Sequence, residues 1–158
     1  MKHLTILREY LDQRMPGSTR PEIDCTCGAL NHAAVHFFRV HGQPVAAICP
    51  ETRPLTAEDL ERAVGHGPVE PLASRESAAI FADTELGHMH WYENPFGFGV
   101  YVDRALAACP EIVFCPRMYF GRRGECLRVP TSRFLNVTHA VVLALTSVAP
   151  DEANAWAV

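Results

Sequence analysis

Residues 33–49 read Ala-Ala-Val-His-Phe-Phe-Arg-Val-His-Gly-Gln-Pro-Val-Ala-Ala-Ile-Cys, and this stretch decides the fold class. Two short apolar runs, Ala33 to Arg39 and Pro44 to Cys49, flank the dipeptide His41-Gly42, which is a turn signal. The stretch therefore predicts a β-hairpin. The proline-bounded segment 50–54 that follows ends the second strand.

Outward from the hairpin, short strands alternate with short helices. Thr56 is an expected N-cap because Glu58 and Asp59 follow it in the first turn of a helix that ends at Gly65. Strands outnumber helices and are mostly joined by hairpins or single helices. This pattern predicts an α+β fold, with helices flanking a curved, mostly antiparallel sheet. The other expected helices are at 4–11, at 76–81 (capped by Ser74) and from Thr131 or Ser132, and Asp103 is expected to cap a turn or helix that runs through Ala108. The other expected strands are at 69–73, 100–102, 111–114 and 126–129.

Composition narrows the class of protein. The chain has 158 residues, of which 48% are hydrophobic, and contains neither repeat nor linker, so we expect a single domain over residues 1–158. A net charge of −4 excludes a general polyanion binder with a basic surface everywhere. Lys2 is the only lysine beside thirteen arginines, so no internal lysine is present to act as a base or phosphate clamp.

The N-terminus and the cysteines indicate the compartment. No apolar run approaches the roughly 20 residues that a membrane span needs, and the first residues lack the apolar core of a secretion signal. Six cysteines in such a chain are most simply reduced thiols. We therefore expect a cytoplasmic protein without a membrane partner.

One cluster raises the alternative of a metal-binding protein. Cys25, Cys27, His32 and His36 place four soft-metal ligands within twelve residues. The C-x-C spacing lacks the two to four spacer residues of a zinc knuckle, and the aromatic residues after His36 favour a strand over a helix. Two buried thiols and two ordinary histidines are the simpler interpretation.

Two further segments carry candidate chemistry. In an extended chain His88 and His90 point to the same side, which suits a metal ion or acid–base work near neutral pH, although a surface loop without a function explains them as well. Aromatic residues among the glycines of the same loop are typical of a stacking surface for a planar ring, although they also commonly cap a core. A basic group near the C-terminus suits phosphate contacts, and a solvated hairpin face explains it equally well. The aromatic residues are Trp91, Tyr92, Phe96 and Phe98, and the basic residues are Arg117, Arg122, Arg123, Arg128 and Arg133.

A family resemblance extends over about residues 35 to 135. Its segments, in order, are Gly42–Pro50, Leu72–Ser74, Phe81–Gly87, Gly97–Asp103 and Glu111–Phe114. Their order and spacing resemble the YbaK/EbsC family of prolyl-tRNA synthetase-associated editing domains, as a divergent member. The resemblance implies the fold of that family and an aminoacyl-tRNA deacylase, which hydrolyses the ester between a wrong amino acid and the terminal ribose of tRNA. Aminoacylated tRNA is then the expected partner, and no cofactor is expected.

The chain departs from the family at two places. The family lysine that anchors the terminal nucleotide falls at or near Ala34, and the family's G-x-x-x-P loop reads Gly87-His88-Met89-His90-Trp91, with tryptophan in place of proline. Either the site is rebuilt or the domain keeps the fold as a non-catalytic tRNA- or small-ligand-binding module. In the rebuilt site, the resemblance implies the following assignments. The catalytic residues are Gly87, His88 and His90, and the substrate-binding residues are His36, Met89, Trp91, Tyr92, Asp103, Arg122 and Arg123.

Overall fold

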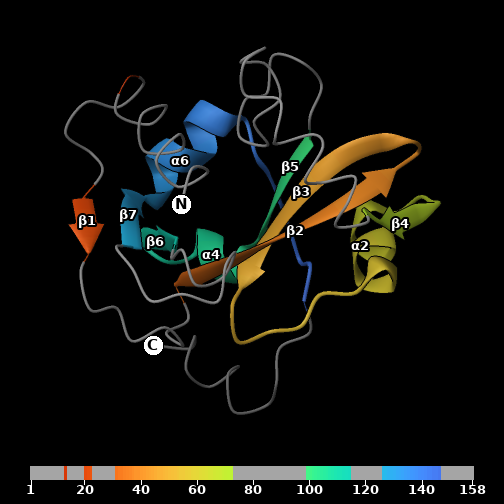
Figure 1. Ribbon diagram of the computed structural model, residues 1–158, viewed down its shortest axis with the longest axis horizontal. Coiled ribbons are helices and arrows are strands. Elements are labelled where there is room, and N and C mark those ends of the chain that lie inside the picture. The colour runs from red at the N-terminus through yellow and green to blue at the C-terminus, as the bar shows by residue number, and fades with distance from the viewer. Residues whose placement is uncertain (1–12, 14–19, 23–30, 73–98, 115–125, 147–158) are drawn as a thin grey trace.

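The computed structural model describes residues 13, 20–22, 31–72, 99–114 and 126–146. Within these residues the chain forms eight strands and three helices, which confirms the expected α+β class (Figure 1). The strands are β1 (Arg20–Glu22), β2 (His32–Val40), β3 (Gln43–Pro50), β4 (Val69–Pro71), β5 (Gly99–Asp103), β6 (Glu111–Phe114), β7 (Cys126–Pro130) and β8 (Val141–Leu143). The helices are α2 (Ala57–Val64), α4 (Arg104–Ala107) and α6 (Thr131–Thr138).

All eight strands belong to one mixed sheet. The order is β1-β7-β6-β2-β3-β5-β8, and β4 pairs with the end of β2. Pairings of β2 with β6, β3 with β5 and β5 with β8 are parallel, and the remaining four are antiparallel. Most pairings are therefore antiparallel, as expected, and the three parallel pairings join strands that are distant along the chain.

The predicted hairpin forms the centre of this sheet. β2 and β3 pair antiparallel from Ala33 with Pro50 to Val40 with Gln43, and both strands curve visibly (Figure 1). The turn places His41 at φ 49 and Gly42 at φ 77, so both turn residues adopt the left-handed conformation. Such a turn matches the twist of the strands that it connects.

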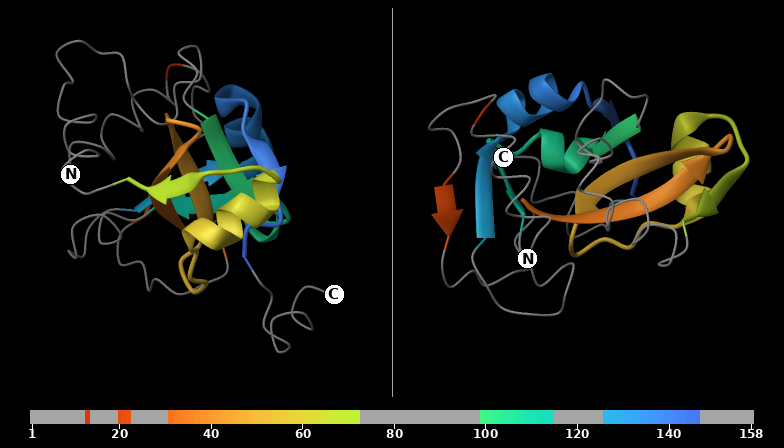
Figure 2. Two further views of the ribbon diagram at one scale, coloured as in Figure 1. Left: turned by 90° about the vertical axis from the view of Figure 1, so that its right-hand side faces the viewer. Right: turned by 45° about the horizontal axis from the view of Figure 1, so that its top comes forward.

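Each face of the sheet packs against its own helices. On one face, Ala46 and Ile48 of β3 pack with Phe134 of α6 and Leu106 of α4. On the other face, β3 contributes Val45 and Ala47, which pack with Leu60 of α2. Figure 2 shows α2 and α6 on different sides of the central strands. Residues alternate between the two faces along each strand, so both faces of β3 are buried.

The helix starts agree with the sequence, with one difference. Thr56 and Asp59 form a reciprocal capping box at the start of α2, and Gly65 ends the helix at φ 85. Asp103 occupies the N-cap of α4 as expected, but its side chain makes no capping hydrogen bond. Its carboxylate instead bonds to residues beyond β8.

Some expectations fall outside the described residues. These are the helices at 4–11 and 76–81. In the part of the chain that is described, no helix is long and apolar enough to cross a membrane.

Candidate functional site

His36 lies in the middle of β2, on the sheet face that α2 covers. Its Cα partner is Ala47 of β3, which in turn pairs with Tyr101 of β5, so the three residues form one row across the sheet. The small side chain of Ala47 separates the imidazole from the phenol ring. Ala34, where the family lysine is expected, precedes His36 by two residues and therefore lies on the same face.

Burial controls the protonation state of His36. The side chain is half-buried, and this desolvation lowers the pKa of the imidazole below its ordinary value of 6.5. The neutral ring is therefore favoured at pH 7. A neutral imidazole offers one hydrogen-bond donor and one acceptor, which suits a hydroxyl group or the edge of a base.

A buried charged cluster lies next to this row. Arg53 and Asp103 are 4% and 2% exposed, and Arg53 Nη1 lies 3.9 Å from Asp103 Oδ2. Asp103 Oδ1 accepts a hydrogen bond from the Leu145 backbone at 3.1 Å, and Oδ2 accepts one from the Thr146 hydroxyl. Arg53 Nη1 also donates to Thr146 Oγ1 at 3.5 Å. The cluster ties the segment before α2 to the ends of β5 and β8.

Cys49 is the thiol closest to this cluster among the described residues. It pairs with Ala34 across the hairpin, and its Sγ contacts the Arg53 carbonyl oxygen at 3.6 Å. Burial raises the pKa of Cys49 to about 12, with a further increase from Asp103 and an opposing effect of Arg53. The thiol is therefore protonated at neutral pH and unsuited to act as a nucleophile.

The structure describes two of the ten predicted site residues. His36 is half-buried on the α2 face, whereas Asp103 is buried with both carboxylate oxygens already accepting hydrogen bonds. A substrate contact by Asp103 stays a prediction that this arrangement does not favour. The other eight, Gly87, His88, Met89, His90, Trp91, Tyr92, Arg122 and Arg123, lie outside the described residues.

The metal-binding alternative gains no support from the described residues. His32 and His36 lie on β2, as the aromatic flank predicted, and His32 is buried. No group of three or more His, Cys, Asp or Glu side chains converges within the described ranges. Cys25 and Cys27 lie outside those ranges.

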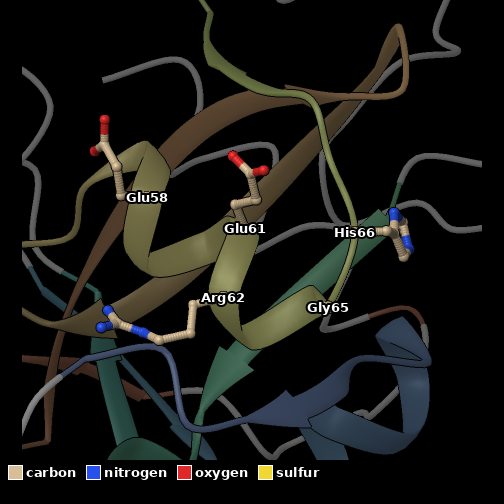
Figure 3. Close-up of a pocket in the computed structure, with 5 residues that line it drawn as sticks. All are labelled: Glu58, Glu61, Arg62, Gly65 and His66. Carbon is tan, nitrogen blue, oxygen red and sulfur yellow. The ribbon is translucent and has the colours of Figure 1, made fainter.

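A surface pocket of about 460 Å³ lies along α2 and the loop that follows it (Figure 3). Glu58, Glu61 and Arg62 line it from the helix, and Gly65 and His66 line it from the loop. Sequence reasoning did not single out this region. Nor did it single out Arg53, because nothing in the local sequence distinguishes this buried arginine from the other twelve arginines.

Comparisons with known proteins connect this geometry to a fold. No family model matches the sequence, and no curated protein matches it significantly. Solved structures do match. A candidate trans-editing enzyme for prolyl-tRNA synthetase superposes with a TM-score of 0.65 at 16% identity, covering 93% of this chain and 98% of the other.

Two other structures agree with that fold. An epitope scaffold made by computational backbone grafting gives a TM-score of 0.67 at 15% identity, with 94% of this chain and 99% of the other covered. A candidate signal transduction protein from Marinobacter aquaeolei VT8 gives 0.64 at 14% identity, with 87% of this chain but only 29% of the other covered. At these identities the likeness shows that the chain has the editing-domain-like fold, and nothing about its activity.

Proposed function

We propose that this chain is an aminoacyl-tRNA deacylase-like protein that hydrolyses the ester of a mischarged tRNA. The observation that carries the proposal is His36, a half-buried imidazole whose lowered pKa keeps it neutral, on the central hairpin of an editing-domain-like fold. It lies two residues from Ala34, where the resembling family has a lysine.

In this proposal His36 binds the terminal nucleotide in place of that lysine. An imidazole donates one hydrogen bond and accepts another, whereas an ammonium group only donates. His36 therefore contacts a ribose hydroxyl or a base edge, and Trp91 and Tyr92 stack on the terminal adenine. Met89 lines the same site, and Arg122 and Arg123 contact phosphates of the acceptor stem.

The chemical step uses the loop from Gly87 to His90. His88 or His90 removes a proton from a water molecule, which attacks the ester carbonyl carbon. A backbone N–H of the loop stabilises the oxyanion of the tetrahedral intermediate. The intermediate collapses, the ribose oxygen takes up a proton, and the products are the free amino acid and tRNA with a free ribose hydroxyl. Asp103 contributes by holding Arg53 and the segment after β8 in place.

The test is ester hydrolysis by the purified full chain on a panel of mischarged tRNAs. We expect hydrolysis above the buffer rate for at least one of them, with His90→Ala strongly slowed. Loss of the His36 contact costs a hydrogen bond, so His36→Ala should raise KM about tenfold with a smaller change in kcat. His36→Gln, which keeps a donor and an acceptor, should recover part of the loss.

His139→Ala serves as the matched control, because His139 is an exposed histidine at the end of α6. Its rate should equal that of the wild-type chain. An unchanged KM in His36→Ala would remove the role of His36, and an unchanged rate in His90→Ala would remove that of His90.

The loss of lysine at Ala34 favours a second candidate, a binding module without catalysis. This candidate predicts that the chain binds tRNA 3′ ends, or a small ligand, while the ester stays intact. A gel-shift measurement on the same tRNA panel separates it from the enzyme, since only the enzyme releases the amino acid.

A further inference from the structure

Two histidines far apart in the sequence form a pair at one end of the sheet. His41 lies at the tip of the β2–β3 hairpin, and His66 lies in the loop between α2 and β4. His41 Nε2 and His66 Nδ1 are 2.6 Å apart, and the rings stack with centroids 4.6 Å apart and planes at 27°. The two nitrogens are within hydrogen-bonding distance, and the tautomer of each ring decides which one donates.

The backbone on both sides holds the pair in place. The N–H of His41 donates to the Pro68 carbonyl oxygen at 3.2 Å, which joins the hairpin tip to the α2–β4 loop. Gly65 ends α2 in the left-handed conformation, and its N–H donates to the Glu61 carbonyl oxygen at 2.9 Å. The two imidazoles are therefore positioned by two separate elements and not by one flexible loop.

We propose that His41 and His66 form a binding site for a divalent transition-metal ion of the zinc, nickel and copper class, through Nε2 of His41 and Nδ1 of His66. Imidazole nitrogen is a preferred ligand of these ions, at a metal–nitrogen distance of about 2.0–2.1 Å. Two such ligands at the tetrahedral angle have their nitrogens about 3.3 Å apart. Metal binding therefore requires the two nitrogens to separate by about 0.7 Å and both rings to turn until their lone pairs point at the metal.

Proton balance allows this replacement. In the hydrogen-bonded pair, the donor ring carries a proton on the nitrogen that faces the other ring. That ring moves the proton to its other nitrogen when the metal binds, so neither ring changes its charge. Both side chains are exposed, which leaves the remaining coordination positions open to water.

The surroundings favour a cation held by an open site. Glu58 and Glu61 line the pocket that His66 also lines (Figure 3). The Glu61 side chain lies against Gly67, the residue after His66. Of the nearby cations, Arg62 is paired with Asp59 and Arg39 donates to the Gly42 carbonyl oxygen. No third protein ligand converges with the pair in the described ranges, so the site is a two-histidine site completed by water.

The test is metal titration of the full chain after treatment with a chelator. Calorimetry with Zn²⁺, and with Cu²⁺ as a spectroscopic probe, should show one saturable equivalent. The electron paramagnetic resonance spectrum of bound Cu²⁺ should show two nitrogen ligands. His41→Asn and His66→Asn should each weaken binding about tenfold or more, because each removes one of two protein ligands. Asparagine tolerates the positive φ of His41, so the hairpin turn is preserved.

His139→Asn is the matched control, since His139 is also exposed and also adopts a positive φ of 54°. It should bind as the wild-type chain does, and circular dichroism should show all three variants folded. Absence of a saturable equivalent in the wild-type chain overturns the proposal. Wild-type affinity in either His41→Asn or His66→Asn also overturns the proposal, because the metal would then bind elsewhere, for instance at Cys25 and Cys27.

Discussion

Arg53 and Asp103 form a buried ion pair in the described part of the molecule. Both are almost fully buried, and Asp103 also accepts hydrogen bonds from Leu145 and Thr146. Removing one member of a buried ion pair leaves the other charge uncompensated in a medium of low dielectric constant. The pair is therefore costly to break, whatever its net contribution to stability.

We predict that Arg53→Met and Asp103→Asn each lower the free energy of unfolding by about 3 kcal/mol. The double variant should lose clearly less than the two single losses combined, because the second change removes the uncompensated charge left by the first. Urea unfolding of the four proteins measures this directly.

Arg62→Met is the matched control for this prediction. Arg62 is 68% exposed and pairs with Asp59 on the surface of α2, so its loss should cost less than about 1 kcal/mol. Equal losses in Arg53→Met and Arg62→Met would show that burial does not distinguish the two pairs.

His36 predicts a pH dependence of stability. Burial lowers the pKa of the folded-state imidazole below 6.5, its value in the unfolded chain, so the unfolded chain binds the proton more tightly. This contribution to stability is present above pH 6.5 and is lost as the pH falls through the folded-state pKa. The slope is at most about 1.4 kcal/mol per pH unit.

Urea unfolding between pH 7.5 and 5 measures this slope, with His36→Gln as the comparison. The variant should lose less stability on acidification than the wild-type chain, because glutamine does not titrate. Parallel pH profiles for the two proteins would show that protonation of His36 is not opposed by the fold.

For individual residues, the sequence predicted the place in a secondary-structure element better than the hydrogen-bond partners of the side chain. It placed Asp103 at the start of a helix, which is correct, but the bonds of its carboxylate reach 42 and 43 residues along the chain. No local pattern encodes such a contact. Arg53 appeared only as one of thirteen arginines, and its burial depends on the packing of strands that are distant in sequence.

At the scale of elements, helix α2 shows what local signals encode. Thr56 accepts a hydrogen bond from the Asp59 backbone at 3.2 Å, and the Asp59 carboxylate accepts one from the Thr56 backbone at 3.1 Å. The pKa of Asp59 is lowered, and the hydrogen bond from the Thr56 backbone N–H is the largest cause. The sequence predicted this start from three neighbouring residues, and both partners lie in the same turn.

We predict that Thr56→Ala lowers the free energy of unfolding by about 1 kcal/mol, because it removes the hydroxyl that accepts from Asp59. Thr56→Ser keeps the hydroxyl and should stay close to the wild-type value. The denaturant midpoint of the three proteins checks this, and equal midpoints for alanine and threonine would contradict it.

Strands were predicted where turns mark them and missed where they do not. The β2–β3 hairpin is bounded by His41-Gly42 and by prolines, so it was evident from the sequence. β8 was missed because its three residues have no turn signal and their partner, β5, is parallel and lies about 40 residues earlier. Parallel pairing is hard to predict from neighbouring residues, because the two strands are separated along the chain by a long crossover connection.

At the scale of the whole molecule, the sheet separates two apolar clusters, one against α4 and α6 and one against α2. His36 belongs to the second face, at the centre of the sheet and away from the hairpin tip that carries His41. The fold agrees with that of the candidate trans-editing enzyme over nearly the whole of both chains. That residues 1–158 form a single domain stays a prediction.

The most direct measurement is the rate at which the wild-type chain releases amino acids from mischarged tRNAs at neutral pH, relative to buffer alone. The proposal predicts a faster release for at least one aminoacyl-tRNA, because it assigns the half-buried imidazole of His36 to binding the terminal nucleotide. A rate equal to that of buffer on every member of the panel would contradict it.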